Sequence, residues 1–152
     1  MVRLFKHYIP HAVILLGLFD VVLLALAAEL GWRMRAGQIG IDIGAAFDRT
    51  WQLGGFTVGM LTAMIAVGVY GTDATRSLRY AGARILVAIS LGTIGLSFID
   101  WLLNGTHFWR STLAYGMVNA VFLLMANRIV VGGILGANAF RRRVLVLGAG
   151  SR

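Results

Sequence analysis

The sequence predicts an all-α membrane protein, a four-transmembrane-helix bundle with both termini on the cytoplasmic side. Apolar residues make up 59% of the 152 positions and charged residues only 13%, which is too apolar a composition for a soluble domain. The few charges are grouped between long apolar runs. This pattern argues against a soluble enzyme and against a nucleic-acid-binding protein, even though the net charge is +8. The absence of cysteine excludes disulfide bonds, thiolate metal sites and a cysteine nucleophile.

Four apolar stretches are long enough to cross a bilayer, for which about 20 helical residues are needed. Helix is the expected conformation, because lipid cannot satisfy free backbone N–H and C=O groups. The four tryptophans lie near the outer boundaries of these stretches, where indole prefers the headgroup region: Trp32, Trp51, Trp101 and Trp109. The predicted spans, which together form a bundle over residues 12–130, are 12–30, 51–70, 85–103 and 111–130.

Basic residues in the connections predict the orientation, because positively charged loops stay in the cytoplasm. The two ends and loop 71–84 share one side, which has nine basic residues against one acid: Arg3, Lys6, Arg76, Arg79, Arg84, Arg141, Arg142, Arg143 and Arg152 against Asp73. The opposite side has four basic residues against three acids: Arg33, Arg35, Arg49 and Arg110 against Glu29, Asp42 and Asp48. We therefore expect a multi-pass membrane protein with cytoplasmic termini, and the resemblance given below implies that the membrane is the bacterial inner membrane. The expected contacts with anionic lipids, rather than nucleic acid, are Arg76, Arg79, Arg84, Arg141, Arg142 and Arg143.

Shorter segments flank the bundle. Residues 1–11 are expected to form an interfacial segment, because Leu4, Phe5, Tyr8 and Ile9 are spaced as on an amphipathic helical turn. Residues 131–143 form a basic exit beside the membrane. The first span also has features of a cleaved signal peptide, but three further spans and the interruption by Asp20 favour an uncleaved helix.

Asp20 is the most informative residue inside a span, about 12 Å along the first helix if that helix starts at Ala12. A carboxylate in the membrane often marks an ion or substrate path. Arg128, near the inner end of the fourth span, is its candidate partner; the alternative is that the Arg128 side chain extends to lipid phosphate. With few other polar residues in the spans, a structural ion pair or a protonated, hydrogen-bonded Asp20 is favoured over a proton relay.

Small residues at four-residue spacing are candidates for helix packing: Gly55, Gly59 and Ala63 in the second span, and Ala88 and Gly92 in the third. Such residues let helices approach closely, either within one bundle or between copies in a homo-oligomer. Packing within the bundle is the favoured interpretation.

No complete catalytic or metal-binding set is present. His7, His11 and His107 are scattered, and no carboxylate is near the first two in sequence. No Ser, His and Asp combination suggests a nucleophile, and Asp73 has no second cytoplasmic carboxylate beside it with which to bind Mg²⁺. We therefore assign no catalytic, cofactor-binding or metal-binding residue to this chain.

The C-terminal residues have the pattern of a buried parallel strand, residues 144–147, followed by a glycine loop in which Gly148 and Gly150 are present. This is the start of a Rossmann-like domain whose remaining loop residue and helix are missing. A parallel strand also needs neighbouring strands, which this chain does not offer. Residues 144–152 are therefore expected to be the beginning of a truncated domain; the alternative is a flexible apolar tail.

These features resemble the N-terminal region of bacterial polyprenyl-phosphate sugar-1-phosphate transferases. The residues that carry the resemblance are the four inward-ended spans, loop 68–84 (GVYGTDATRSLRYAGAR) and the exit RRRVLVLGAGSR at 141–152. The opening MVRLFKHYIPHAVILLGLFDVVLLALAAELGWRMRAG is similar to exopolysaccharide sugar transferases associated with exosortase systems. The resemblance extends over essentially all 152 residues, although the glycine loop is widely shared.

The resemblance implies that an absent C-terminal catalytic domain transfers a sugar 1-phosphate from a nucleotide sugar to undecaprenyl phosphate with Mg²⁺. The chain itself would anchor that domain, with the lipid bilayer, polyprenyl phosphate and a second copy as candidate partners. Two alternatives stay open. The chain could be the membrane domain of an NAD(P)-dependent nucleotide-sugar dehydratase or epimerase, or a self-contained four-helix membrane protein such as a small transporter that uses Asp20.

Overall fold

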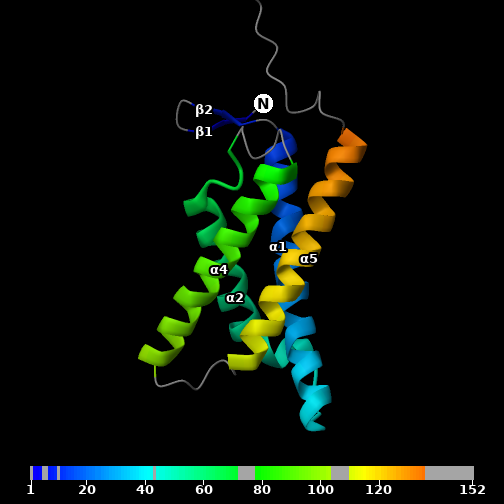
Figure 1. The fold of residues 1–152 in the computed structure, drawn as a ribbon, viewed down its shortest axis with the longest axis vertical. Coiled ribbons are helices and arrows are strands. Elements are labelled where there is room, and N and C mark those ends of the chain that lie inside the picture. The colour runs from blue at the N-terminus through cyan, green and yellow to red at the C-terminus, as the bar shows by residue number, and fades with distance from the viewer. Residues whose placement is uncertain are drawn as a thin grey trace, which may run out of the picture.

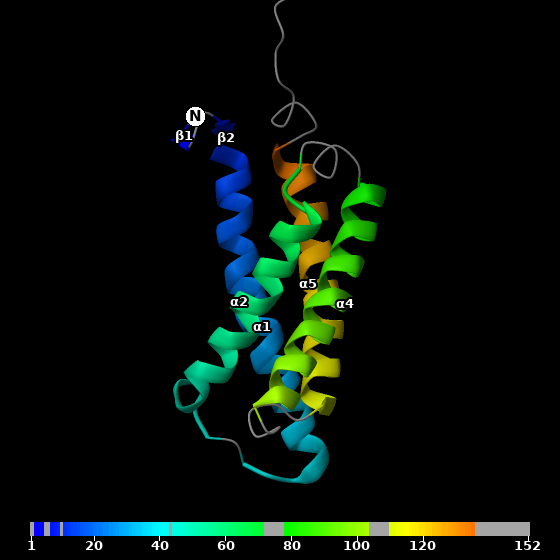
Figure 2. The same ribbon diagram turned by 90° about the vertical axis from the view of Figure 1, so that its left-hand side faces the viewer.

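The structure, a computed structural model, describes residues 2–4, 7–9, 11–42, 44–71, 78–103 and 110–135. Four long helices form a bundle (Figures 1 and 2). All four are long and apolar enough to cross a membrane, as the sequence predicts. Their bounds are His11–Ile39 for α1, Thr50–Val67 for α2, Leu78–Leu102 for α4 and Arg110–Leu135 for α5.

α1, α4 and α5 extend beyond the apolar runs that predicted them, whereas α2 ends at Val67, three residues before the predicted end at residue 70. α1 continues nine residues past the predicted end at residue 30, and α4 begins seven residues before residue 85. Hydropathy marks the part of a helix that lies in lipid, but a helix continues into water when its residues favour helix, as Arg33 and Arg35 do in α1. The first five residues of the predicted exit, 131–135, continue α5, and residues 136–152 lie outside the described part.

The N-terminal segment contains two short strands rather than the expected helical turn. β1 (Val2–Leu4) pairs antiparallel with β2 (His7–Ile9), with Val2 opposite Ile9 and Leu4 opposite His7. The expectation of a helical turn was wrong because the helical spacing competes with two stronger preferences. Val, Tyr and Ile favour strands, and Ile9 precedes Pro10 in the sequence, which disfavours the helical conformation at Ile9.

The helices pack as two main pairs, α1 with α5 and α2 with α4. α1 and α5 run antiparallel, so the start of α1 and the end of α5 lie at the same end of the bundle (Figure 1). The start of α4 lies at that end as well (Figure 2). All four helices contribute fully buried side chains to one core, among them Leu24, Met60, Ile85, Ile89 and Leu124.

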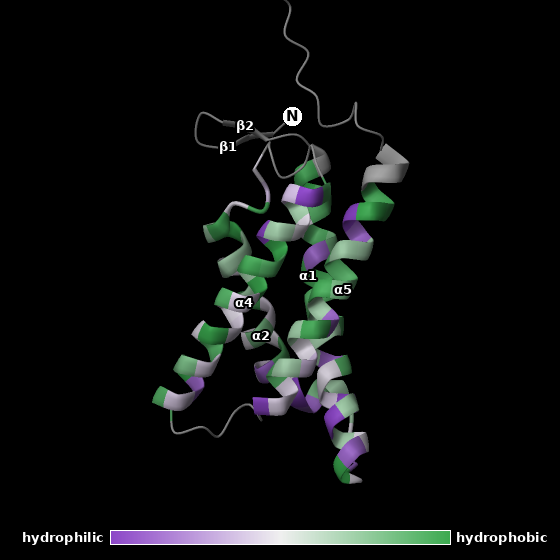
Figure 3. Cartoon of the chain, viewed as in Figure 1, coloured by the Kyte–Doolittle hydropathy of each residue, from purple (hydrophilic) through white to green (hydrophobic). Residues whose placement is uncertain are grey.

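The outer surface of the bundle is apolar. Large hydrophobic side chains are exposed on every long helix, for example Leu18, Val58, Ile94 and Phe122. Figure 3 shows hydrophobic residues over most of the helices, whereas hydrophilic residues gather towards the lower end in that view. An apolar exterior is what a lipid-facing surface requires.

Four of the five predicted packing residues lie inside the bundle. A Cβ atom at Gly92 would lie 2.7 Å from the sulfur of Met60, and one at Gly59 would lie 2.7 Å from a methyl carbon of Leu96, so these glycines allow α2 and α4 to approach. Ala63 and Ala88 are buried in the bundle. Gly55, by contrast, is exposed.

The backbones of α1 and α5 approach each other closely at Gly31 and Gly116. A Cβ atom at Gly31 would lie 2.8 Å from the backbone nitrogen of Gly116 and 3.0 Å from the carbonyl oxygen of Thr112. Backbone atoms cannot move aside as a side chain can. The sequence analysis did not single out this pair, because the two glycines stand on different helices and Gly31 lies one residue past the predicted end of the first span.

We predict that Gly31→Ala destabilises the bundle because the added methyl group forces α1 away from α5. We expect the free energy of unfolding in detergent, followed by circular dichroism, to fall by about 1–3 kcal/mol. Gly37→Ala is the matched control in the same helix, because no atom lies within 4 Å of a Cβ there, and it should be neutral or stabilising by up to about 1 kcal/mol. Equal effects of the two substitutions would contradict the close contact.

Candidate functional site: the Asp20 network

Asp20 is completely buried and accepts hydrogen bonds from three side chains. Its Oδ2 accepts from Nη2 of Arg128 at 2.8 Å and from the hydroxyl of Tyr70 at 2.9 Å. Its Oδ1 accepts from Nδ2 of Asn127 at 2.9 Å. We call these four residues the Asp20 network; it joins α1, α5 and the turn that follows α2.

The end of α2 places Tyr70 in the network. α2 ends at Val67 and is capped by Gly68, which has a left-handed conformation with φ of 75°. The N–H groups of Gly68 and Val69 donate to the carbonyl oxygens of Ile65 and Met64. This is a common way to terminate a helix, and glycine adopts the required φ without strain. The turn directs Tyr70 towards α1, where Gly17 faces an edge of the Tyr70 ring.

Arg128 balances the charge of Asp20 inside the bundle. The ion pair is buried, with side-chain exposures of 6% for Arg128 and 0% for Asp20. The Arg128 guanidinium also lies 5.6 Å from the centre of the Tyr70 ring, a favourable cation–π geometry. Nη1 of Arg128 is buried without a hydrogen-bond partner among the described residues. The Asp20 carboxylate therefore has donors at both oxygens, whereas the Arg128 guanidinium keeps N–H groups without a partner among the described residues.

Tyr70 acts as a donor in the network. It lies beyond the candidate span that ends at Val67. Burial first, and then the charge of Asp20, raises the pKa of the Tyr70 phenol above its ordinary value. The phenol is therefore protonated at neutral pH and donates to the carboxylate. Both oxygens of Asp20 are engaged by donors, which is the geometry of a structural ion pair rather than of a group free to carry protons.

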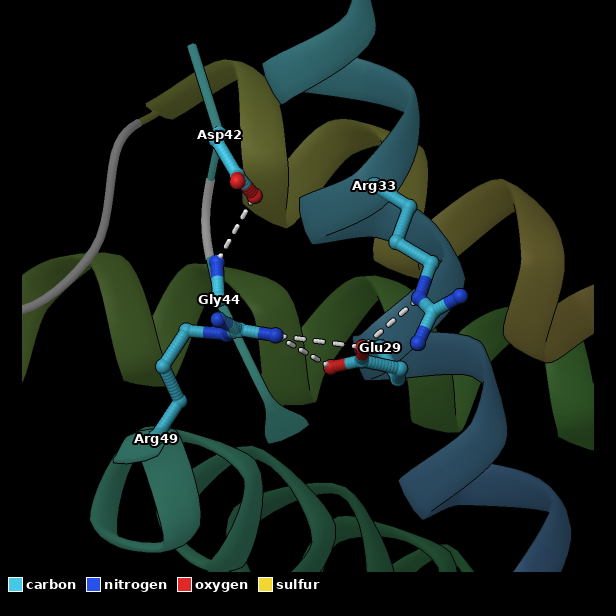
Figure 4. Close-up of polar contacts among 5 residues, drawn as sticks. All are labelled: Glu29, Arg33, Asp42, Gly44 and Arg49. Atoms are coloured by element: carbon cyan, nitrogen blue, oxygen red, sulfur yellow. Dashed lines mark hydrogen bonds and ion pairs between the residues drawn. The ribbon is translucent and has the colours of Figure 1, made fainter. Parts of the chain in front are cut away.

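A second polar cluster lies around Glu29, nine residues further along α1 (Figure 4). Nη2 of Arg49 bridges both oxygens of Glu29, at 3.0 and 3.1 Å, and Nε of Arg33 donates to Oε1 at 2.8 Å. Arg49 comes from the short 3-10 helix η1 (Ala46–Arg49) and is buried, with its guanidinium 5.9 Å from the Trp32 ring. Figure 4 also shows Asp42, whose carboxylate accepts from the N–H of Gly44 at 3.1 Å and shapes the loop before η1.

The sequence analysis missed most of the Glu29 cluster. It counted Arg49 as an outer-loop charge and Trp32 as an interfacial residue, whereas both are buried at 7% and 9% exposure. The Glu29–Arg33 pair could have been found from its four-residue spacing on a helix. Arg49 is 20 residues away from Glu29 along the chain, across a loop, so no local pattern indicated that contact.

The basic residues expected at lipid headgroups differ in their surroundings. Arg79 is exposed in the first turn of α4. Arg84 is partly buried and donates from Nη1 to the carbonyl oxygen of Gly68 at 2.8 Å, so it binds the C-terminal end of α2. The other expected lipid contacts (Arg76, Arg141, Arg142 and Arg143) and the glycines of the incomplete loop (Gly148 and Gly150) lie outside the described residues.

In the described part of the chain, no group of three or more His, Cys, Asp or Glu residues could hold a metal ion. In comparisons with known proteins, no family model, curated protein or solved structure matches the chain. The chemistry of the site therefore has to be argued from its own residues. Within the described ranges, these provide two buried ion-pair clusters, one towards each end of the bundle.

We predict that Asp20→Ala destabilises the bundle strongly, because it leaves the Arg128 charge buried without its partner. The free energy of unfolding in detergent should fall by about 3–5 kcal/mol. In the double variant Asp20→Ala with Arg128→Met, the loss should be smaller than the sum of the two single losses, with a coupling energy of about 1–3 kcal/mol. Strictly additive effects would show that the pair does not act as a unit.

Proposed function

We propose that this chain is the membrane anchor of a polyprenyl-phosphate sugar-1-phosphate transferase of exopolysaccharide synthesis. The bundle holds a cytoplasmic catalytic domain at the leaflet where the lipid acceptor resides. The observation that carries the proposal is the common position of three segments at one end of the bundle: the start of α1, the start of α4 and the end of α5 (Figures 1 and 2). The sequence assigns the nine-base side to this end, which favours a cytoplasmic location.

Anchoring has a direct physical benefit for an enzyme that acts on a lipid. An enzyme confined to the bilayer encounters its lipid substrate at a raised effective concentration, without an additional binding site. The identification of the substrate as undecaprenyl phosphate rests on the resemblance of residues 1–37, 68–84 and 141–152 to the sugar transferases. In this proposal Mg²⁺ and the catalytic carboxylates belong to the catalytic domain.

The glycine pattern after residue 147 favours a second candidate, the membrane domain of an NAD(P)-dependent nucleotide-sugar dehydratase or epimerase. Both candidates use the bundle in the same way and differ in the reaction of the attached domain. The transporter hypothesis has less support, because both carboxylate oxygens of Asp20 are occupied by donors.

We predict that the nine-base end of the bundle faces the cytoplasm. Since the chain has no cysteine, single-cysteine variants can be labelled without background. Leu78→Cys, exposed at the start of α4, should react with a membrane-impermeant maleimide only after the cells are permeabilised. Ile41→Cys, exposed in the loop after α1, should react in intact cells. The reverse pattern would place the termini outside and would exclude anchoring of a cytoplasmic domain.

We predict that sugar-phosphate transfer depends on residues 1–152 as an anchor. In the bacterium that carries the gene, deletion of the coding sequence for these residues should abolish transfer of labelled sugar phosphate from a nucleotide sugar to undecaprenyl phosphate in isolated membranes. An unrelated four-span bundle with cytoplasmic termini in their place should restore part of the transfer.

Purified residues 1–152 provide the control and should insert into vesicles but transfer nothing. Loss of NAD(P)-dependent conversion of the nucleotide sugar, with lipid-linked sugar unaffected, would instead support the dehydratase or epimerase. Transfer by residues 1–152 alone would contradict a purely anchoring role.

A further inference from the structure

Asn119 of α5 carries a side-chain amide that the described residues leave largely unsatisfied. Its Nδ2 lies 3.5 Å from the sulfur of Met34, and a thioether is a weak acceptor. Its Oδ1 accepts no hydrogen bond within the described part of the chain. The residue is only partly buried, so the amide is accessible from outside the bundle.

The position of Asn119 along α5 makes an unsatisfied amide energetically unfavourable in a membrane. The candidate span runs from Arg110 to Val131, so Asn119 is about 13 Å from one end and about 18 Å from the other along the helix. A short Asn side chain cannot reach the headgroups from that depth. In hydrocarbon, an amide without hydrogen-bond partners is strongly unfavourable, and therefore the amide requires a partner that also lies within the bilayer.

Asn119 stands in the middle of a regular seam that borders α1 and continues onto the outward side of α5. Its first two residues face α1, because the Tyr115 hydroxyl accepts from Nε2 of Gln38 at 2.6 Å and the Asn119 amide lies beside Met34. Residues 115, 119, 122, 126 and 129 follow each other at steps of four, three, four and three, the spacing of a coiled-coil contact. Phe122 and Ile129 on this seam are 72% and 57% exposed, and Ala126 is exposed as well. No charged residue occurs between Arg110 and Arg128, so two such seams can meet without electrostatic repulsion.

We propose that the seam binds a second copy of this chain, with the two Asn119 amides hydrogen-bonded to each other. A primary amide carries both donors and acceptors, so it is complementary to itself. Two copies inserted in the same orientation are related by a two-fold axis along the membrane normal, which places identical residues at the same depth. A polar residue in such a seam also fixes the register of the contact. The proposal requires insertion of α5 in the membrane and is independent of the transferase reaction.

Cysteine crosslinking in native membranes tests the contact directly. Ala126→Cys lies on the seam, and we expect it to form a disulfide-linked dimer under mild oxidation. Ala83→Cys on α4 is the matched control, because it is the same substitution at an exposed position. It lies five residues from the start of its candidate span, and Ala126 lies five residues from the end of its own, both at the same end of the bundle. The control should crosslink at least tenfold more slowly. Equal rates at the two positions would overturn the proposal.

Substitution of Asn119 tests the amide itself. Energy transfer between labelled copies in vesicles gives the dimer dissociation constant, which Asn119→Leu should raise about 3- to 30-fold, the range expected for interhelical hydrogen bonds in membranes. Asn119→Gln keeps the amide and should bind closer to the original chain than Asn119→Leu does. The free energy of unfolding of each variant, measured at a dilution at which the chain is monomeric, shows whether the fold is retained. An unchanged dissociation constant for a folded Asn119→Leu would overturn the role of Asn119.

Discussion

The burial of the Asp20 carboxylate is the constraint on which the arrangement of the helices depends. An ionised carboxylate inside an apolar bundle is tolerated only beside a positive charge and hydrogen-bond donors, and Arg128 provides the charge. The pair fixes one point of the antiparallel contact between α1 and α5. The close approach of Gly31 and Gly116 fixes another. Eleven residues of α1 and twelve of α5 separate the two points, about 17 Å along each helix, so the register of the two helices is determined twice.

The Glu29 cluster provides a similar constraint towards the other end of α1. Glu29 and Asp20 are nine residues apart, about 13 Å along the helix axis, and each binds a segment that is distant in the sequence. Asp20 holds the turn after α2 through Tyr70, whereas Glu29 holds η1 through Arg49. The exposed Arg33 contributes little to stability, since water screens its charge. Arg49 is buried and matters more, because removal of Glu29 would leave its charge without this counter-charge in a desolvated place.

The four helices could be predicted from hydropathy. Charged side chains and free backbone groups are unfavourable in lipid, so a long run of apolar residues indicates a membrane-spanning helix. The ends of the helices could not be predicted in this way, because a helix such as α1 continues past its apolar run, and hydropathy does not distinguish polar helix from polar loop. Asp20 and Arg128 could be identified as unusual, and their pairing was a reasonable hypothesis, because each needs a counter-charge. Tyr70, Asn127 and Arg49 were not predicted as partners of these acids: a phenol, an amide and a loop arginine are ordinary at those positions in the sequence, and only the packing of distant segments brings them to a carboxylate.

α5 separates its two kinds of contact by the geometry of the helix. Asn119 and Arg128 are nine residues apart, which is two and a half turns at 3.6 residues per turn, so they lie on opposite sides of α5. The Arg128 side is committed to the interior of the bundle, whereas Asn119 is partly exposed at the edge that borders Met34 of α1, and in our proposal this edge also contacts a second copy. Packing at that face would place two α5 helices about 8–10 Å apart. α5 continues for seven residues beyond Arg128. In such a dimer the end of each α5 would be held in its own bundle by Arg128 and would lie near the end of the partner's α5. Self-association and anchoring are therefore compatible, since neither requires the contacts of the other to open.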